Sequence, residues 1–220
     1  MIEHVYRRAE LARSVEAVLV ATDDERIAKA VRAFGGHVVL TRADHASGTD
    51  RLAEVAAQLT CEIVVNVQGD EPMIDPAAID AAIAPLVASP QVLIGTLRRR
   101  IDDEADLDNP SVVKVVVDRD GFALYFTRAR VPFVRPDHPE PITWRHIGLY
   151  VYRREFLLRL SSLPQTPLER AEGLEQLRAL EHGYRICTVE TTGGAIGPLS
   201  VDTPEDLERV RRLIGAGAKA

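Results

Sequence analysis

Hydrophobic positions along the chain switch repeatedly between short continuous runs and helical spacing. The run "VEAVLVAT" (15–22) is rich in β-branched residues and predicts a strand, whereas "DDERIAKAVRAF" (23–34) repeats apolar residues at helical intervals and ends at Gly35 and Gly36. The same alternation predicts further strands over 37–41 and 62–67, and further helices over 49–59 and from Pro76. These repeats indicate an alternating α/β fold with a largely parallel sheet.

The pattern changes in the middle of the chain. "VVKVVVDRDGFALYFTR" (112–128) predicts two antiparallel strands around a turn at Asp118 to Gly121. The later predicted elements are a strand over 143–153, two helical stretches of which the second covers 167–183, a strand over 184–190, and a closing helix with Thr203 as its cap and Pro204 at its first position.

Composition narrows the class of protein. Of 220 residues, 46% are hydrophobic and 27% are charged, which is ordinary for a globular chain. The longest apolar runs fall far short of the roughly 20 residues that span a bilayer, so we expect a soluble, cytoplasmic protein. A formal net charge of -6 argues against non-specific binding of nucleic acid. Cys61 and Cys187 fit no metal-ligand or redox spacing, and both are expected to be small buried residues.

Two adjacent carboxylates, Asp70 and Glu71, follow the strand predicted over 62–67. Ligands of open α/β sheets bind beyond the carboxyl ends of the strands, so both lie where a ligand is expected. They could hold a hard cation such as Mg²⁺, which takes one or two carboxylates together with substrate phosphates. The alternative is that one of them caps the turn before the helix at Pro76.

Other acidic residues have simpler explanations. Asp206 lies three residues after the Thr203 cap, which is the spacing of a capping box, whereas Asp202 lies outside that helix and is a second candidate for the cation. Asp23 and Asp24 follow a predicted strand, and we interpret them as the start of a helix.

Two further segments carry candidate chemistry. "TRADHASGTDR" (41–51) joins a strand to a helix, and its hydroxyls and free amides suit a phosphate or a nucleobase edge; the alternative is an ordinary loop capped by Ser47 or Thr49. In "RHIGLY", strand alternation sends His146, Gly148 and Tyr150 to one face. A lone histidine there is more often structural than catalytic.

Taken together, several motifs resemble one family, the CMP-Kdo synthetases, which are 3-deoxy-manno-octulosonate cytidylyltransferases. The motifs are "TRADHASGTDRLAEV", "VNVQGDEPMI", "NPSVVKVV", "ALYFTRARVPF", "RHIGLYVYR", "PLERAEGLEQLR" and "VDTPEDLERVR". The resemblance implies a single domain of Rossmann-like nucleotide-diphospho-sugar transferase fold, with a mainly parallel sheet and an antiparallel dimerisation section. Residues 1–97 would form the nucleotide-binding half, 98–152 the dimerisation section, and 153–220 the half that completes the sugar-acid and metal sites.

The resemblance also implies a reaction and its residues. Mg²⁺-dependent attack of the anomeric hydroxyl of Kdo on CTP would give CMP-Kdo, for lipopolysaccharide, and pyrophosphate, in a homodimer that needs no nucleic acid or membrane. The implied catalytic residues are Asp70, Asp202 and Gln68, with Asp70 and Asp202 as metal ligands; the nucleotide would contact Arg42, Ser47, Gly48, Thr49 and Gln68; and the sugar acid would contact Arg128, His146, Tyr150, Glu175 and Gln176.

The chain departs from the family at its N-terminus, and we expect this difference to affect the binding of CTP. The family begins with a strand and a Gly-, Arg- and Lys-containing loop around the triphosphate, and Met1-Ile2 aligns after that loop. We expect the 220-residue form to bind CTP weakly, and interpret the difference as a misplaced start codon rather than as an inactive paralogue. The rival hypotheses are a cytidylyltransferase for another sugar acid, such as a sialic acid, and a non-catalytic remnant that binds nucleotide or sugar.

Overall fold

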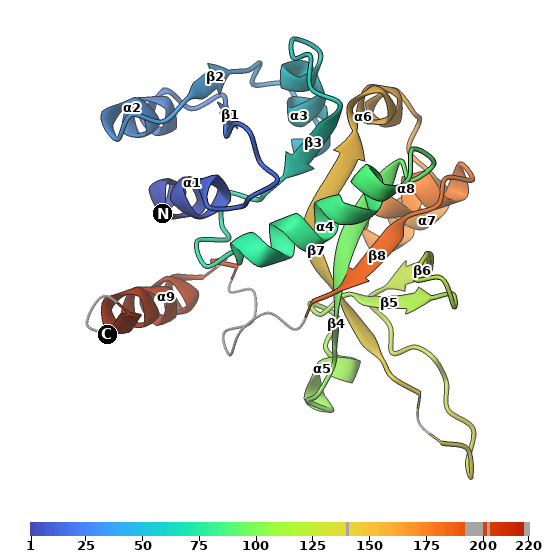
Figure 1. The fold of residues 1–220 in the computed structure, drawn as a ribbon. Coiled ribbons are helices and arrows are strands. Elements are labelled where there is room, and N and C mark those ends of the chain that lie inside the picture. Colours follow the sequence, from blue (N-terminus) through green and yellow to red (C-terminus); the bar gives the residue numbers. More distant parts are fainter. Residues whose placement is uncertain (140, 192–199, 202, 218–220) are drawn as a thin grey trace. The chain divides into compact units, whose positions relative to one another are not determined.

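The computed structural model describes residues 1–139, 141–191, 200–201 and 203–217, without the side chains of 216–217 (Figure 1). The chain forms two compact units. Unit 1 comprises 1–59, 66–80 and 193–220, and unit 2 comprises 60–65 and 81–192. Within the described ranges, no helix is long and apolar enough to cross a membrane.

Unit 1 contains short strands between helices. Its elements are α1 (Ile2–Glu10), β1 (Val20–Thr22), α2 (Glu25–Ala33), β2 (Val38–Leu40), α3 (Gly48–Ala56), the first turn of α4 (Pro76–Ala88) and α9 (Pro204–Gly217). β1 and β2 pair in parallel with Val20 opposite Val38, so both predicted strands are confirmed but are shorter than their apolar runs. α2 ends where Gly35 takes a φ of +81°, which a glycine adopts without strain.

Within unit 1, helix α1 is held by an aromatic contact. Tyr6 is 3% exposed, and its ring meets that of Phe34 edge-on at 5.4 Å between centroids. The Tyr6 hydroxyl donates to the Val18 carbonyl at 3.2 Å and accepts from the His37 amide at 3.2 Å. The side chain therefore ties α1 to the segments that lead into β1 and β2.

Unit 2 is built on a mixed sheet. Its strands run in the order β6-β5-β7-β4-β8, and β3 also pairs with β7. The bounds are β3 (Ile63–Asn66), β4 (Ile94–Arg100), β5 (Lys114–Val117), β6 (Ala123–Thr127), β7 (Trp144–Arg153) and β8 (Cys187–Glu190). β4 pairs with β8 in parallel and with β7 antiparallel, while β5 pairs antiparallel with β6 and β7. The predicted hairpin and the long strand are confirmed.

Helices complete unit 2 and supply much of its core. They are the later turns of α4, α5 (Ala105–Asp108), α6 (Arg154–Ser161), α7 (Pro167–Glu172) and α8 (Gln176–Glu181). Leu86, Leu157 and Leu177 are fully buried together with Leu97 and Val151 of the sheet. These side chains form the apolar contacts that hold the sheet against its helices.

Two expectations were wrong. The single helical stretch over 167–183 is two helices, because Gly173 ends α7 in the left-handed region at φ +62°. Cys61 is exposed rather than buried, whereas Cys187 is buried as expected. Gly173 is therefore the break between α7 and α8.

Candidate active site

The acidic loop after β3 is held by the segment before α9. Ser200 Oγ donates to Asp70 Oδ2 at 3.1 Å, and the Val201 amide donates to the Asp70 carbonyl at 2.9 Å. The helix α4 is capped by Asp75, whose Oδ1 accepts from the Ala77 amide at 3.0 Å. Asp75 therefore serves as the cap of α4, while the alternative in which Asp70 or Glu71 caps the turn before that helix stays a prediction.

Asp202 lies outside the residues that the structure describes, so its position is untested. Asp206 forms the expected reciprocal cap with Thr203: the Thr203 amide donates to Asp206 Oδ2 at 3.0 Å, and the Asp206 amide donates to Thr203 Oγ1 at 3.2 Å. Across the described ranges, no group of three or more His, Cys, Asp or Glu side chains could hold a metal ion. Mg²⁺ often binds only one or two protein carboxylates, because the substrate phosphates supply further ligands. The absence of a group of three among the described residues therefore does not bear on such a site.

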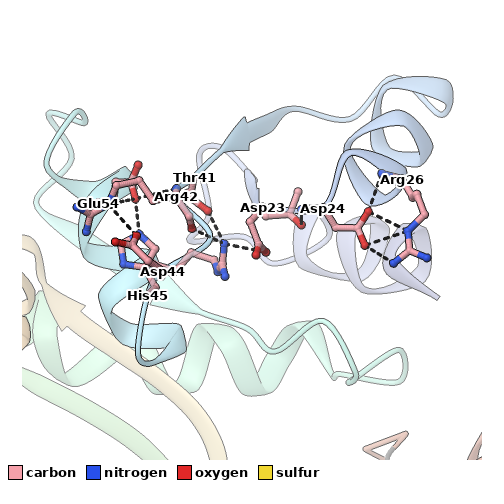
Figure 2. Close-up of polar contacts among 10 residues, drawn as sticks. Asp23, Asp24, Arg26, Thr41, Arg42, Asp44, His45 and Glu54 are labelled. Atoms are coloured by element: carbon pink, nitrogen blue, oxygen red, sulfur yellow. Dashed lines mark hydrogen bonds and ion pairs between the residues drawn. The ribbon is translucent and has the colours of Figure 1, made fainter.

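Arg51 of α3 joins the ends of β1 and β2 through Asp23 and Thr41, both of which are labelled in Figure 2. Its Nη1 lies 3.0 Å from Asp23 Oδ1 and donates to the Thr41 hydroxyl. The Thr41 amide donates to the Thr22 carbonyl at 3.0 Å, which extends the parallel pairing by one step. Asp24 caps α2 as expected, and the side chain of Arg26, with its amide, lowers the pKa of Asp24 to about 2.

The loop between β2 and α3 is ordered by Glu54 (Figure 2). Its carboxylate contacts the His45 ring and accepts from the Arg42 amide at 3.3 Å. The hydrogen bond with His45 is the main reason why the pKa of Glu54 is lowered. Arg42 is exposed, and its Nε lies 3.4 Å from Asp44 Oδ1. The loop is therefore pre-formed, with the Arg42 guanidinium at the surface.

The start of α3 carries three of the predicted nucleotide residues. Ser47 is the N-cap and accepts from the Asp50 amide at 3.1 Å, so of the caps considered, Ser47 is the one used. Gly48 is the first helical residue, and Thr49 is buried. Gln68 is exposed in the loop after β3, where its Nε2 donates to Asn66 Oδ1 at 3.4 Å. All of these residues belong to unit 1.

In unit 2, His146 and Tyr150 lie close together on β7. Their ring centroids lie 5.3 Å apart, which confirms that both side chains are on one face of β7. His146 Nε2 lies 2.9 Å from Thr96 Oγ1, and burial lowers the pKa of His146 to about 3. Burial also raises the pKa of Tyr150 well above its usual value, with smaller contributions from Tyr152 and Glu175. Both groups are therefore neutral at physiological pH.

Arg128 joins β6 to α7. Its Nε donates to the Glu172 carbonyl at 2.8 Å and its Nη1 to the Pro110 carbonyl at 3.0 Å, while its amide donates to Glu172 Oε2 at 2.9 Å. The Thr127 hydroxyl donates to Glu172 Oε1 at 2.6 Å. Burial would raise the pKa of Glu172, but these hydrogen bonds from Arg128 and Thr127 lower it on balance. The guanidinium is thus oriented by backbone carbonyls.

A buried lysine fixes the backbone of the same region. Lys114 is 0% exposed, and its Nζ donates to the carbonyls of Asn109, Val112 and Arg128 at 2.8, 2.9 and 2.9 Å. Burial lowers the pKa of Lys114. Its three donors thus bond the carbonyl of Arg128 to two carbonyls of the loop that precedes β5.

Glu175 and Gln176 lie at the start of α8, directly after the break at Gly173. The buried Arg178 donates to Glu169 through Nε at 2.9 Å and Nη2 at 2.5 Å, and its Nη2 lies 3.7 Å from Glu175 Oε1. Five supporting residues were not identified from the sequence: Thr96, Lys114, Glu169, Glu172 and Arg178. Each lies in a quoted motif or in the strand that was not predicted, and no local pattern marked any of them as different from an ordinary surface or core residue.

Comparisons with known proteins show the family to which the chain belongs. A family model described as cytidylyltransferase matches residues 1–186. The 3-deoxy-manno-octulosonate cytidylyltransferase of Solibacter usitatus is 57% identical over 98% of this chain and 84% of its own length. That of Geobacter sulfurreducens is 54% identical over 96% of this chain and 87% of its own.

Solved structures give the same result. A structure of CMP:2-keto-3-deoxy-manno-octonic acid synthetase complexed with CTP matches with a TM-score of 0.92 and 43% identity, over 98% of this chain and 88% of that one. A 4-diphosphocytidyl-2C-methyl-D-erythritol synthase from Anaerococcus prevotii matches at a TM-score of 0.62 and 12% identity, which is a likeness of fold alone. The Rossmann-like nucleotidyltransferase fold expected from the sequence is confirmed.

Proposed function

The chain belongs to the family of 3-deoxy-manno-octulosonate cytidylyltransferases, and from this premise we propose that it transfers CMP from CTP to Kdo. The observation that carries the proposal is 57% identity to a relative of that name over 98% of this chain. The products are CMP-Kdo, which serves lipopolysaccharide synthesis, and pyrophosphate. Neither a non-catalytic remnant nor an enzyme for another sugar acid has comparable support.

The reaction is a displacement at phosphorus. The anomeric 2-hydroxyl oxygen of Kdo attacks the α-phosphorus of CTP, the bond from that phosphorus to the bridging oxygen breaks, and pyrophosphate leaves as the hydroxyl proton is lost. Little covalent chemistry falls to the protein, so its residues act by positioning the reactants and by stabilising charge. The pre-formed loop between β2 and α3 and the fixed side chains of unit 2 are suited to positioning.

Asp70 and Asp202 are proposed to hold Mg²⁺. The donor set fits, because carboxylate oxygens are hard ligands, and the bonds from Ser200 and Val201 keep Asp70 next to the chain just before position 202. A bound Mg²⁺ supplies charge neutralisation for the phosphate oxygens. Asp70 itself contributes a carboxylate whose orientation is fixed by the Ser200 hydroxyl.

The nucleotide is proposed to bind unit 1. Arg42, Ser47, Gly48 and Thr49 lie on one short stretch at the start of α3, where Ser47 Oγ already accepts the Asp50 amide and keeps its own proton for a cytosine acceptor. Gln68 is exposed on the loop that contains Asp70 and would contact substrate with its amide. Polar groups that are already oriented lose less entropy on binding.

The sugar acid is proposed to bind Arg128, His146, Tyr150, Glu175 and Gln176 of unit 2. Arg128 uses three N–H groups on carbonyls, which leaves two of its five donors for a carboxylate. The Tyr150 hydroxyl is buried and has no hydrogen-bond partner among the residues described. An unpaired buried hydroxyl costs about 1–3 kcal/mol, which a bound sugar hydroxyl would offset.

A homodimer in the cytoplasm completes the proposal. Apolar side chains are exposed in and around the section predicted for dimerisation: Phe133 is 86% exposed, Leu124 61% and Ile142 53%. A second copy of the chain that packed on this section would bury these side chains.

Release of pyrophosphate tests the function. The chain is incubated with CTP in large excess, Mg²⁺ and Kdo, and each component is omitted in turn; we expect release only when all three are present. Asp70→Asn should lower turnover at least about 100-fold with an unchanged circular dichroism spectrum, as expected for lost charge stabilisation. Asp120→Asn, an exposed turn residue, is the matched control. Wild-type turnover in Asp70→Asn would remove Asp70 from the site.

A further inference from the structure

Thr96 is the one side chain that bonds to the ring of His146 among the described residues. It lies in β4 and is 0% exposed. The pairing of β4 with β7 shifts between Thr96 and Leu97, where β7 has additional residues. At this irregularity the Thr96 Oγ1 reaches the Leu149 carbonyl at 2.7 Å and the Ile147 carbonyl at 3.1 Å, as well as His146 Nε2 at 2.9 Å.

The number of available protons determines which group donates and which accepts in each of these three contacts. A threonine hydroxyl has one proton, and a carbonyl oxygen can only accept. If Thr96 donated to His146, its lone pairs would face two carbonyl oxygens at 2.7 and 3.1 Å without a proton between them. Thr96 therefore donates to a carbonyl, that of Leu149 being the nearer, and accepts a hydrogen bond from the Nε2–H group of His146.

This leaves the other ring nitrogen as an acceptor. A neutral imidazole with its proton on Nε2 has a lone pair on Nδ1, and burial keeps the ring neutral by lowering its pKa. No described residue forms a hydrogen bond with Nδ1. The ring is held between Phe126, edge-on at 5.0 Å, and Tyr150 at 5.3 Å between centroids. The buried, unpartnered Tyr150 hydroxyl lies on the same face.

We propose that Thr96 is a positioning residue of the sugar-acid site, which fixes His146 in the Nε2–H tautomer so that Nδ1 accepts a hydrogen bond from a hydroxyl group of the acid. The identity of the ligand rests on the proposed function, whereas the tautomer is a property of the chain alone. A neutral acceptor selects a hydroxyl and rejects a carboxylate. His146 therefore recognises the polyol part of the acid and leaves the carboxylate to a cationic side chain.

The tautomer is measured directly by long-range ¹H–¹⁵N correlation of the chain labelled at its six histidines. The His146 signal is identified by its loss in His146→Gln. We expect a protonated Nε2 and an unprotonated Nδ1 in the ligand-free chain. A proton on Nδ1, or on both nitrogens, overturns the inference, and this result does not depend on whether the chain is active.

Kinetics test the consequence for the substrate. Thr96→Val keeps the shape and removes the hydroxyl, and we expect the KM for Kdo to rise about tenfold, equivalent to about 1.4 kcal/mol, while the KM for CTP stays within about twofold. Thr96→Ser should restore the wild-type value. Thr188→Val is the matched control, because Thr188 is a buried threonine opposite Thr96 in β8 without contact to His146.

Each outcome bears on the inference. Equal effects of Thr96→Val and Thr96→Ser, or a parallel rise in the KM for CTP, contradict the positioning role. If Thr96→Val fails to fold, Thr96→Ser and the tautomer of the wild-type chain decide. If no sugar acid is turned over, the proposed function fails, and the tautomer measurement still confirms or overturns the arrangement of Thr96 and His146.

Discussion

Among single residues, Glu169 and Arg178 form a buried ion pair in unit 2. Both side chains are less than a tenth exposed and form a bidentate pair. Burial would raise the pKa of Glu169, but its bonds with Arg178 and with the Thr166 amide lower it on balance. The pair joins α7 to α8 and so holds Glu175 in place.

Removing the guanidinium of Arg178 should lower the stability of the fold. Arg178→Met leaves the Glu169 carboxylate buried without its partner, so we expect the free energy of unfolding in urea to fall by about 3–5 kcal/mol. Arg170→Met, on an exposed arginine of α7, should change it by less than about 0.5 kcal/mol. Equal losses in the two variants would contradict this role of the pair.

The buried His146 makes a second prediction, for acid stability. Its folded pKa of about 3 lies below the ordinary value of 6.5, so between these values the unfolded chain binds a proton that the native chain does not. The stability from the neutral ring is present above pH 6.5 and falls as the pH drops. Between pH 7.5 and 5.5 this loss is about 1.4 kcal/mol.

Urea unfolding at both pH values measures that loss. His146→Gln should lose about 1.4 kcal/mol less than wild type between pH 7.5 and 5.5, because glutamine does not titrate. His138→Gln, at an exposed position, should keep the wild-type dependence. Identical slopes for wild type and His146→Gln would show that the ring is not buried as a neutral group.

At the scale of elements, the helix break at Gly173 determines where Glu175 and Gln176 lie. Nothing lies within 4 Å of a Cβ added there, so Gly173→Ala tests only the cost of a left-handed backbone, about 1–2 kcal/mol of unfolding free energy in urea. Gly48→Ala, which also meets open space but has no positive φ, should not be destabilising. A Gly173→Ala variant as stable as wild type would contradict the left-handed conformation.

The order of helices and strands was predictable wherever the hydrophobic periodicity was strong. The prediction failed where the packing required a glycine. The strand β4 was missed because Gly95 interrupts its apolar run and three arginines end it. The structure shows why glycine is there: an added Cβ would lie 3.0 Å from Leu86 Cδ1 and 3.2 Å from the Ala82 carbonyl of α4. Close packing of a helix on a strand is a tertiary requirement, which local sequence patterns do not reveal.

At the scale of the whole molecule, sequence motifs predicted the family and the reaction, while the supporting contacts came from the structure. His146 and Tyr150 were placed on one face by strand alternation alone. The hydrogen bonds from Ser200 to Asp70 and from Arg128 to Glu172 join residues that are distant in the chain, and no spacing rule predicts such pairs. The nucleotide residues fall in unit 1 and the sugar-acid residues in unit 2.

We expect this chain to transfer CMP to Kdo in preference to other sugar acids. The most direct test is a competition in which CTP in large excess, Mg²⁺ and equal amounts of Kdo and N-acetylneuraminate are incubated with the chain, and the products are identified by mass spectrometry and ³¹P NMR. We expect CMP-Kdo as the dominant sugar nucleotide, with one pyrophosphate released for each molecule formed. A dominant CMP-N-acetylneuraminate signal, or no sugar nucleotide at all, would contradict the account.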